Sequence, residues 1–433
     1  MAVRGEGVWI YDAHGRRILD FASSAVVNFI GHGDATIARA MAEQAAQLEF
    51  AHSSNFTTEV AEEFARELLE FAGPAFEGGA IFFTSGGSES VETALKLARQ
   101  YQVESGHFER YQVVSRRQSY HGATLGAMAV GGNQARRGIY LPMLREFPKA
   151  SIPYCYRCPF DCSNGCADCG LKYAAEAEQA VAETKGTAAA FIMEPVSGAT
   201  LGAAAPPPSY VKRVSQICGE HNILLIADEV MTGFGRTGRR FAMDHYGAAP
   251  DMIAAGKGIS SGYAPLGAVI AQRYVVDAIA SGTSTLLHGF TYNGHPVSVA
   301  AGRAVLKRIL QANLIDAADS GRPNSASSVL QSMLQPLWKL DSVGDIRGLG
   351  LMWAVEFVAD RRTKMPFPAE RKFAARVNEC ALSRGVLLFP MQGCADGVCG
   401  DHIMIAPPAI ITADEIRWAV QQVAEAISEA DSP

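Results

Sequence analysis

The sequence predicts an α/β protein with a large domain, built on a mostly parallel sheet, and a smaller α+β domain. Three observations carry this prediction: a length of 433 residues, a hydrophobic content of 48%, and short apolar runs that alternate with helical patterns. A chain of this length exceeds one ordinary compact core, so we expect it to divide into domains. Strands that alternate with helices are typical of a largely parallel sheet.

The large domain is expected between residues 51 and 300. Its strand candidates are short apolar runs, the central ones apolar on both faces as in a buried parallel sheet. They lie at 80–83, 111–115, 188–193, 223–228 and 266–271. Helical patterns lie between several of these runs, at 88–101, 171–185 and 209–221.

The smaller domain is expected to comprise residues 301–433 together with an N-terminal segment, residues 1–50. The C-terminal part begins within a long helical pattern and ends with a helix that starts near Thr412; between them lie the strand-like stretches GLGLMWAVEF, GVLLFP and HIMIAPP and a helical pattern at 369–384. The N-terminal stretch GVWIYDAHGRRILDF predicts two strands across a turn that join this domain.

The charge pattern argues against nucleic acid and membranes as partners. The formal net charge is -6, the sequence pI is about 6.0, and the lysines and arginines are scattered rather than clustered. No apolar run approaches the roughly 18 residues that suggest a membrane span. The first residues carry charge and glycine where a signal peptide is apolar, so we expect a cytoplasmic protein.

Ligands of open parallel sheets bind beyond the carboxyl ends of the strands, so the residues at those ends are the site candidates. After the first strand, TSGGSE offers Gly86, Gly87 and Ser88 at a helix start, where backbone N–H groups suit a phosphate. After the second, Tyr120 of SYHG offers a flat aromatic surface and His121 a polar neighbour. Each feature also has a structural explanation, namely a glycine turn and core packing.

Two charged residues follow the later strands. Asp228 ends a very apolar strand, where a carboxylate requires an arginine, a helix terminus or the protonated ring nitrogen of a cofactor. Lys257 lies between glycines in IAAGKGISSG. Such a lysine is commonly a surface residue, but an amine desolvated in an apolar pocket has a lowered pKa and forms Schiff bases. Together, a phosphate cradle, an aromatic plate, a buried aspartate and this lysine match the parts of pyridoxal 5′-phosphate.

Eight motifs occur in an order and spacing that is specific as a set: TSGGSESVETALKLAR, SYHG, IMEPV, ADEVMTGFGRTG, AAGKGISSGYAPLGAV, GFTYNGHP, IRGLGLMWAVEF and APPAIIT. This set covers nearly the whole chain and resembles the class III, or ω-type, aminotransferases of pyridoxal-phosphate fold type I. The resemblance implies transfer of an amino group from an amine or amino acid to an oxo acid such as pyruvate, by a ping-pong mechanism.

The resemblance also implies roles for single residues. Lys257 would hold the cofactor as a Schiff base and then move the substrate proton, while Asp228 would keep the pyridine nitrogen protonated. Val230 and Tyr120 would pack on opposite faces of the ring.

The remaining assignments concern the phosphate and its surroundings. Gly86, Gly87 and Ser88 would hold the phosphate, and Thr291 would reach the phosphate of the neighbouring subunit. A homodimer with shared active sites is therefore implied, and the sequence leaves open whether dimers pair into tetramers. His121 and Glu194 complete the residues assigned to the cofactor site.

Two positions depart from the family pattern. Met404 stands where many relatives that bind an α-carboxylate carry an arginine, and Ala413 stands where many ω-transaminases carry a mobile one. Glu194 often faces the substrate arginine, so its role is open. We hypothesise a preference for an amine or a large, weakly charged amino donor. The candidates to replace the missing guanidinium are Arg16, Arg136, Arg137 and Arg347.

The stretch CYRCPFDCSNGCADCG is a second anomaly, with thiols at Cys155, Cys158, Cys162, Cys166 and Cys169. Two C-x-x-C units supply the four thiolates of a structural zinc site. Related class III sequences often bear a cysteine-containing surface excursion here, at residues 153–170, with thiols that are free or disulfide-linked. Our interpretation assigns no metal to the chain. Cys394 and Cys399 are close enough in sequence to pair.

Other functions stay open at this point. An aminomutase, a racemase or a decarboxylase of the same fold would use the same Lys257 and Asp228. We expect no dinucleotide-binding G-x-G-x-x-G turn, which disfavours a nicotinamide dehydrogenase. A zinc-knuckle interaction protein on an inactive scaffold predicts degenerate catalytic positions, whereas both residues are present.

Overall fold

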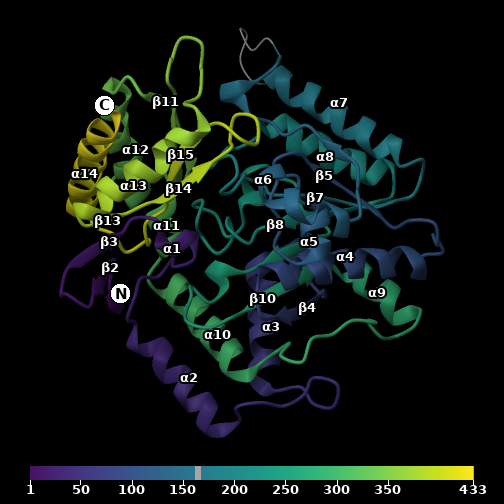
Figure 1. Cartoon of the computed structure of the whole chain (residues 1–433). Coiled ribbons are helices and arrows are strands. Elements are labelled where there is room, and N and C mark those ends of the chain that lie inside the picture. Colours follow the sequence, from purple (N-terminus) through teal and green to yellow (C-terminus); the bar gives the residue numbers. More distant parts are fainter. Residues whose placement is uncertain (161–166, 433) are drawn as a thin grey trace.

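The computed structural model describes residues 1–160 and 167–432, and its largest element there is a seven-stranded sheet (Figure 1). The strand order is β4 (Ala80–Thr84), β10 (Gly267–Ala271), β9 (Met252–Ala255), β8 (Leu224–Asp228), β7 (Ala188–Met193), β5 (Gln112–Arg116) and β6 (Lys149–Ala150). Four of its six pairings are parallel, and β10 is antiparallel to both neighbours. The predicted α/β fold with a mostly parallel sheet is confirmed.

Helices cover both faces of this sheet. They include α4 (Gly87–Glu104), α5 (Leu125–Val130), α7 (Ala167–Glu183), α8 (Pro208–Glu220) and α9 (Arg273–Ser281). Alternate side chains of a strand point to opposite faces. In β7, Phe191 and Met193 therefore pack in a buried cluster with α7 and α8, whereas Ala190 and Ile192 pack in another with α4, α5 and α9.

The remaining strands of the described residues form two smaller sheets. One contains β1 (Ala2–Glu6), β2 (Trp9–Asp12), β3 (Arg17–Asp20) and β13 (Val386–Leu387); the other contains β11 (Val343–Leu349), β12 (Met352–Phe357), β15 (Asp401–Ile405) and β14 (Phe389–Gln392). GVLLFP, expected as one strand-like stretch, is divided between the two sheets. Because β3 pairs in parallel with β13, the N-terminal strands are joined to the C-terminal part of the chain.

The remaining helices surround these sheets. They are α1 (Ser23–Val26), α2 (Ala35–Gln47), α3 (Glu59–Ala72), α6 (Gln134–Arg137), α10 (Pro296–Gln311), α11 (Leu314–Ala318), α12 (Ala326–Leu334), α13 (Phe373–Ser383) and α14 (Ala413–Asp431). α2 and α3 pack on α10, so the first 50 residues touch both the small sheets and the helices beside the large one. The domain boundaries stay predictions.

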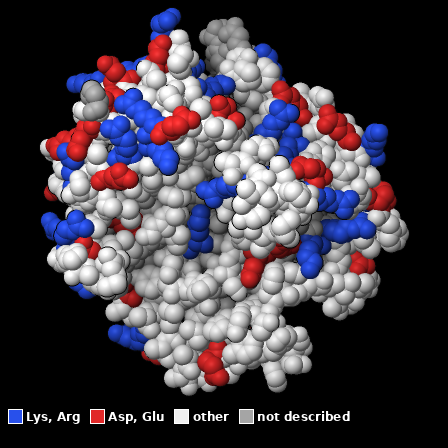
Figure 2. Space-filling view, viewed as in Figure 1, with Lys and Arg blue, Asp and Glu red and all other residues white. Residues whose placement is uncertain are grey.

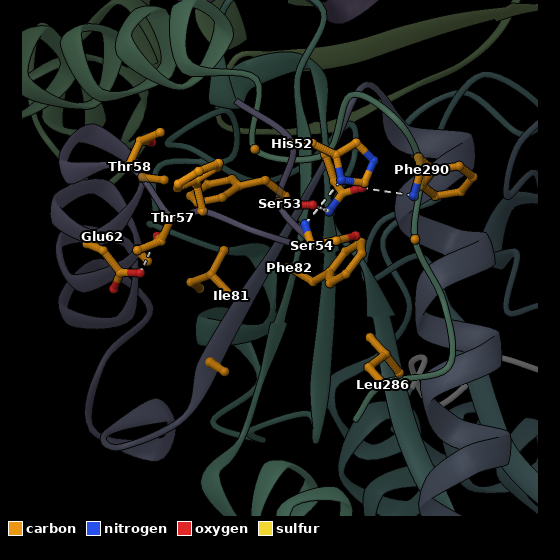
Figure 3. A pocket seen from close by; sticks show the side chains of 18 of the residues that line it. His52, Ser53, Ser54, Thr57, Thr58, Glu62, Ile81, Phe82, Leu286 and Phe290 are labelled. Atoms are coloured by element: carbon orange, nitrogen blue, oxygen red, sulfur yellow. Dashed lines mark hydrogen bonds between the residues drawn. The ribbon is translucent and has the colours of Figure 1, made fainter. Parts of the chain in front are cut away.

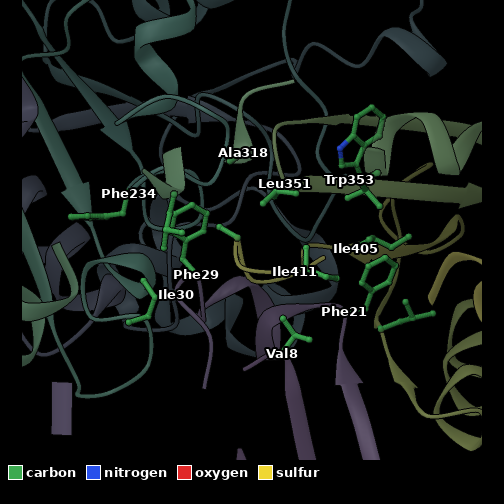
Figure 4. Close-up of a cluster of buried hydrophobic side chains, with 14 of the residues drawn as sticks. Val8, Phe21, Phe29, Ile30, Phe234, Ala318, Leu351, Trp353, Ile405 and Ile411 are labelled. Carbon is green, nitrogen blue, oxygen red and sulfur yellow. The ribbon is translucent and has the colours of Figure 1, made fainter. Parts of the chain in front are cut away.

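One apolar core joins distant parts of the chain (Figure 4). Phe21 follows the N-terminal strands, Phe234 follows β8, and Trp353 and Ile405 belong to the C-terminal sheet; all four are buried. Among residues 1–160 and 167–432, no helix has the length and apolar character that a membrane crossing requires. The cytoplasmic location stays a prediction.

The turn between β11 and β12 lies directly against the segment that follows β8. Gly350 has φ +63°, and a Cβ there would lie 2.4 Å from the Thr237 carbonyl carbon. Leu351 N–H donates to the Arg236 carbonyl at 2.9 Å. The absence of a side chain at Gly350 therefore lets two distant backbones meet.

We expect Gly350→Ala to destabilise the protein far more than Gly247→Ala. Gly247 has φ +62° with nothing within 4 Å of an added Cβ, so it matches the backbone conformation of Gly350 without the close approach. Overpacking at Gly350 should add about 1–3 kcal/mol to the loss of stability. Thermal unfolding of both variants checks this, and equal melting temperatures would contradict it.

Candidate active site

A cavity of about 170 Å³ lies at the carboxyl ends of the parallel strands. Eight of the ten residues that the sequence analysis assigned to the site line it: Gly87, Ser88, Tyr120, His121, Glu194, Asp228, Val230 and Lys257. They come from segments that follow β4, β5, β7, β8 and β9, which end at the same edge of the sheet. Gly86 and Thr291 do not line it.

The start of α4 forms a glycine cradle at one side of the cavity. Gly86 precedes the helix, and Gly87 is its first residue. A Cβ on Gly87 would lie 2.7 Å from Val230 Cγ1, so only glycine permits this approach. Ser88 Oγ accepts a hydrogen bond from Ala123 N–H at 3.0 Å. A helix start with free N–H groups is suited to an anion, most naturally a phosphate.

Asp228 is held in place by two hydrogen bonds. His121 Nδ1 lies 2.7 Å from Asp228 Oδ2, and Val230 N–H donates to Oδ1 at 3.1 Å. β8 ends at Asp228, so Val230 lies beyond the strand but lines the same cavity. The other ring nitrogen of His121, Nε2, is buried without a hydrogen-bond partner among the described residues. A carboxylate fixed in this way can hold a positively charged ring nitrogen.

Lys257 follows β9 with φ 44°, a left-handed conformation that is unfavourable for a residue with a side chain. Burial lowers the pKa of its amine to about 8, although the carboxylates of Asp228 and Glu194 act to raise it. A larger fraction of this amine is therefore neutral near pH 8 than of an ordinary lysine, and the neutral amine is the nucleophile.

Glu194 faces a buried arginine that the sequence analysis did not identify. Burial raises the pKa of Glu194, and Arg116 Nη2 lies 3.7 Å from its Oε2. Gly198 N–H donates to Oε1 at 3.1 Å. Arg116 is the last residue of β5, so the rule of strand ends could have found it. Glu194 thus has a cationic partner from the protein itself.

An apolar wall closes another side of the cavity. Val196 and Met231 line the cavity and also belong to a buried cluster that contains Met404, Met352 and Val26. Met404 is 0% exposed. Met404 is therefore part of an apolar cluster, and Ala413 is the first residue of α14.

Three of the four arginine candidates are engaged elsewhere. Arg16 pairs with Asp12 at 2.8 Å, Arg137 with Glu146 at 2.7 Å, and Arg347 with both Asp345 and Glu356 at 2.8 Å. The fourth, Arg136, lies over the ring of Tyr120 with its Cζ 4.5 Å from the ring centroid.

Thr291 lines a separate, larger cavity of about 1070 Å³ (Figure 3). Segments within residues 51–83 and 285–294 line this cavity, and they include Phe56 with an exposed fraction of 66%. Thr291 is itself exposed. The structure therefore does not bring Thr291 into the Lys257 cavity of its own chain.

The cysteine prediction falls partly outside the described residues, since Cys162 and Cys166 lie in 161–166. Within the described ranges, no group of three His, Cys, Asp or Glu side chains is arranged to hold a metal ion. Cys394 and Cys399 are both thiols rather than a disulfide.

The expectation that the chain contains no G-x-G-x-x-G sequence was wrong. GFGRTG at 233–238 does spell G-x-G-x-x-G. These residues form turns that follow β8 and open no helix, so the N–H groups that bind a pyrophosphate are missing.

Comparison with known proteins agrees with this geometry. The family model "Aminotransferase class-III" matches residues 1–427. An uncharacterised aminotransferase, YodT, of Bacillus subtilis is 35% identical, over 98% of this chain and 94% of that protein. The adenosylmethionine-8-amino-7-oxononanoate aminotransferase of Geobacter sulfurreducens is 36% identical, over 98% of this chain and 91% of that protein.

Solved structures show the same fold. An amine transaminase from an uncultivated Pseudomonas species, in its PLP-bound form, has a TM-score of 0.92 at 34% identity, covering 99% of this chain and 95% of that one. An (S)-enantioselective ω-transaminase from Thermomicrobium roseum has a TM-score of 0.89 at 35% identity, covering 100% and 93%. The chain belongs to the class III aminotransferases.

Proposed function

We propose that this enzyme is a pyridoxal phosphate-dependent transaminase that moves an amino group from an amine or amino acid to an oxo acid through covalent attachment at Lys257. The observation that carries the proposal is one cavity in which a half-buried lysine, a hydrogen-bonded aspartate and a glycine cradle lie together. The chain fits the cofactor, since the cradle excludes a Cβ and Asp228 is free of any arginine partner within the described residues.

Different residues of the site would bind the phosphate, hold the ring nitrogen and transfer the proton. Gly86, Gly87 and Ser88 would bind the phosphate, and Asp228, oriented by His121, would hold the proton of the ring nitrogen. When bound, pyridoxal phosphate supplies an electron sink that stabilises negative charge on the substrate carbon. Lys257, with its lowered pKa, would then take the proton from that carbon and return it.

Tyr120 and Val230 would hold the ring between them, and both line the cavity. The apolar wall of Val196 and Met231 favours an amine, or a large and weakly charged amino donor, over a small charged one. An aminomutase, a racemase or a decarboxylase would use the same lysine, so the products must decide between these activities.

We further propose a homodimer in which Thr291 completes the partner's phosphate site, with pairing of dimers as the alternative assembly. Phe56 lines the large cavity beside Thr291, and Leu287 and Tyr292 belong to the neighbouring segment 285–294. All three side chains are exposed, which is the apolar character of a surface that a second copy covers.

The first test concerns Lys257. The purified protein with pyridoxal phosphate should be yellow, and borohydride should bleach it and fix the cofactor to the Lys257 peptide, as mass spectrometry would show. Lys257→Ala should abolish this attachment and lower kcat by about 10²- to 10⁴-fold or more. Lys372→Ala is the matched control, because Lys372 is exposed and has a similar φ of 47°.

The same material decides the reaction type. Pyruvate with a panel of amines should yield alanine and a carbonyl product in equal amounts. A colourless protein that ignores pyridoxal phosphate would refute the proposal, and a racemised donor without a carbonyl product would favour the alternative activities. Turnover with α-amino acids but with no simple amine would contradict the donor preference.

The second test follows the protonation of Lys257. In the cofactor-free protein, acylation of Lys257 by acetic anhydride should rise with pH through about 8, because burial lowers the pKa from 10.5 and only the neutral amine reacts. Asp228→Asn should move this midpoint to lower pH, since the Asp228 charge raises the pKa of Lys257. Peptide mass spectrometry gives both profiles, and a midpoint near 10.5 would show that the amine is not desolvated.

The third test asks which subunit uses Thr291. Thr291→Ala should weaken pyridoxal phosphate binding by about 10-fold or more, because the variant loses one hydrogen bond to a charged group. Hybrid dimers of one Lys257→Ala subunit and one Thr291→Ala subunit should regain one intact site at limiting cofactor, because each site takes Thr291 from the other chain. If Thr291 acted within its own chain, no hybrid site would be intact and no activity would return.

A further inference from the structure

The family arginine positions are filled by Met404 and Ala413, yet an oxo-acid acceptor always carries a carboxylate. Resting on the proposed function, we infer that Arg136 receives this carboxylate at the entrance to the Lys257 cavity. Arg136 would determine which substrates bind through a carboxylate, while donors without one would bind against the apolar wall.

The position of Arg136 is the first support. Its guanidinium lies over Tyr120, which lines the Lys257 cavity. A second cavity of about 180 Å³ is lined by Arg136 together with Tyr120 and Gly122, two residues that also line the first. The two cavities therefore share Tyr120 and Gly122 in their linings, and Arg136 lines the second.

The availability of Arg136 is the second support. Arg136 is exposed and pairs with no carboxylate among the described residues, whereas its neighbour Arg137 is buried and paired with Glu146. Stacking on Tyr120 uses the flat face of the guanidinium and leaves the in-plane N–H groups for a ligand. Two of them match the two oxygens of a carboxylate.

The charge of Arg136 acts on the amine of Lys257. Burial has the largest effect on the pKa of Lys257, followed by the charges of Asp228 and Glu194. The charge of Arg136 comes next and lowers this pKa. The face of the molecule in Figure 2 is hollowed near its centre, and both basic and acidic side chains lie beside the hollow. In a chain of net charge -6, the positive charge of Arg136, which no carboxylate among the described residues neutralises, attracts an anionic acceptor.

The short helix α6 that carries Arg136 is fixed to the small sheets. Asn133 Oδ1 accepts from Arg136 N–H at 3.1 Å, and Asn133 Nδ2 donates to Gln118 Oε1 at 3.2 Å. Gln118 Nε2 in turn donates to the Gly393 carbonyl, in the loop between β14 and β15, at 3.2 Å. This chain of hydrogen bonds positions the backbone of Arg136 and does not involve its guanidinium.

The test compares Arg136→Gln with Arg145→Gln in the holoenzyme. Arg145 is a matched control, since it is exposed and its Cζ lies 4.3 Å from the ring centroid of Tyr111, the residue before β5. Arg145 lines neither cavity. Arg136→Gln should lower kcat/KM for pyruvate and for L-alanine by about 10- to 100-fold, mostly through KM. The half-reaction with 1-phenylethylamine should stay within about 2-fold of the wild type, and Arg136→Lys should restore part of the loss.

Two results would overturn the inference. An equal loss with 1-phenylethylamine and L-alanine would mean that Arg136 supports the site generally. A weaker affinity for pyridoxal phosphate, with unchanged KM for pyruvate, would assign Arg136 to the cofactor phosphate.

A binding experiment separates this inference from the proposed function. Saturation-transfer NMR should detect pyruvate on the wild-type and Arg145→Gln proteins and lose it for Arg136→Gln. If the wild type reacts with no amine but binds pyruvate through Arg136, the proposed function fails and the carboxylate site stands. If pyruvate binds equally to all three proteins, the carboxylate site is wrong, whatever the activity.

Discussion

The arrangement of the chain depends on one buried cation, Arg236. Its Nη1 donates to the carbonyls of Leu351, Ala406 and Pro407, and its Nη2 donates to the Asn28 carbonyl and Ser23 Oγ. Burial lowers the pKa of this guanidinium to about 9, so its charge is costly but present at neutral pH. The planar fork lets one residue hold the N-terminal segment, the β11–β12 turn and the chain that follows β15.

The composition of the active-site wall follows from this junction. Met404 lies two residues before Ala406, and Val26 lies between Ser23 and Asn28, so the segments that Arg236 holds also carry wall residues. Ser23 to Val26 all have positive φ, a left-handed turn that costs energy in each residue. The side chain of Asp20 stabilises this turn, because Ser24 N–H and Ser24 Oγ both donate to it at 2.8 Å.

The sequence predicted the parts of the site that are local, and it missed the parts that tertiary contacts create. Asp228 and Lys257 could be identified because each follows an apolar strand, and parallel strands end at one edge. Met231, Val196 and Met404 come together only through packing of separate segments, which no spacing encodes. The division of GVLLFP between two sheets escaped for a similar reason, since a continuous apolar run gives no sign of where a strand changes partners.

A transaminase must admit two unlike substrates to one site, and this chain offers two unlike surfaces beside the candidate site. The residues that we propose as cofactor contacts lie at the ends of packed strands, where little movement is possible. The wall around Met404 is buried and apolar, so a charged group cannot enter it without losing hydration. Arg136, by contrast, is exposed on a helix of four residues. In the arrangement that we propose, carboxylate recognition lies with Arg136 rather than with this wall, so it need not obstruct a donor that has no carboxylate.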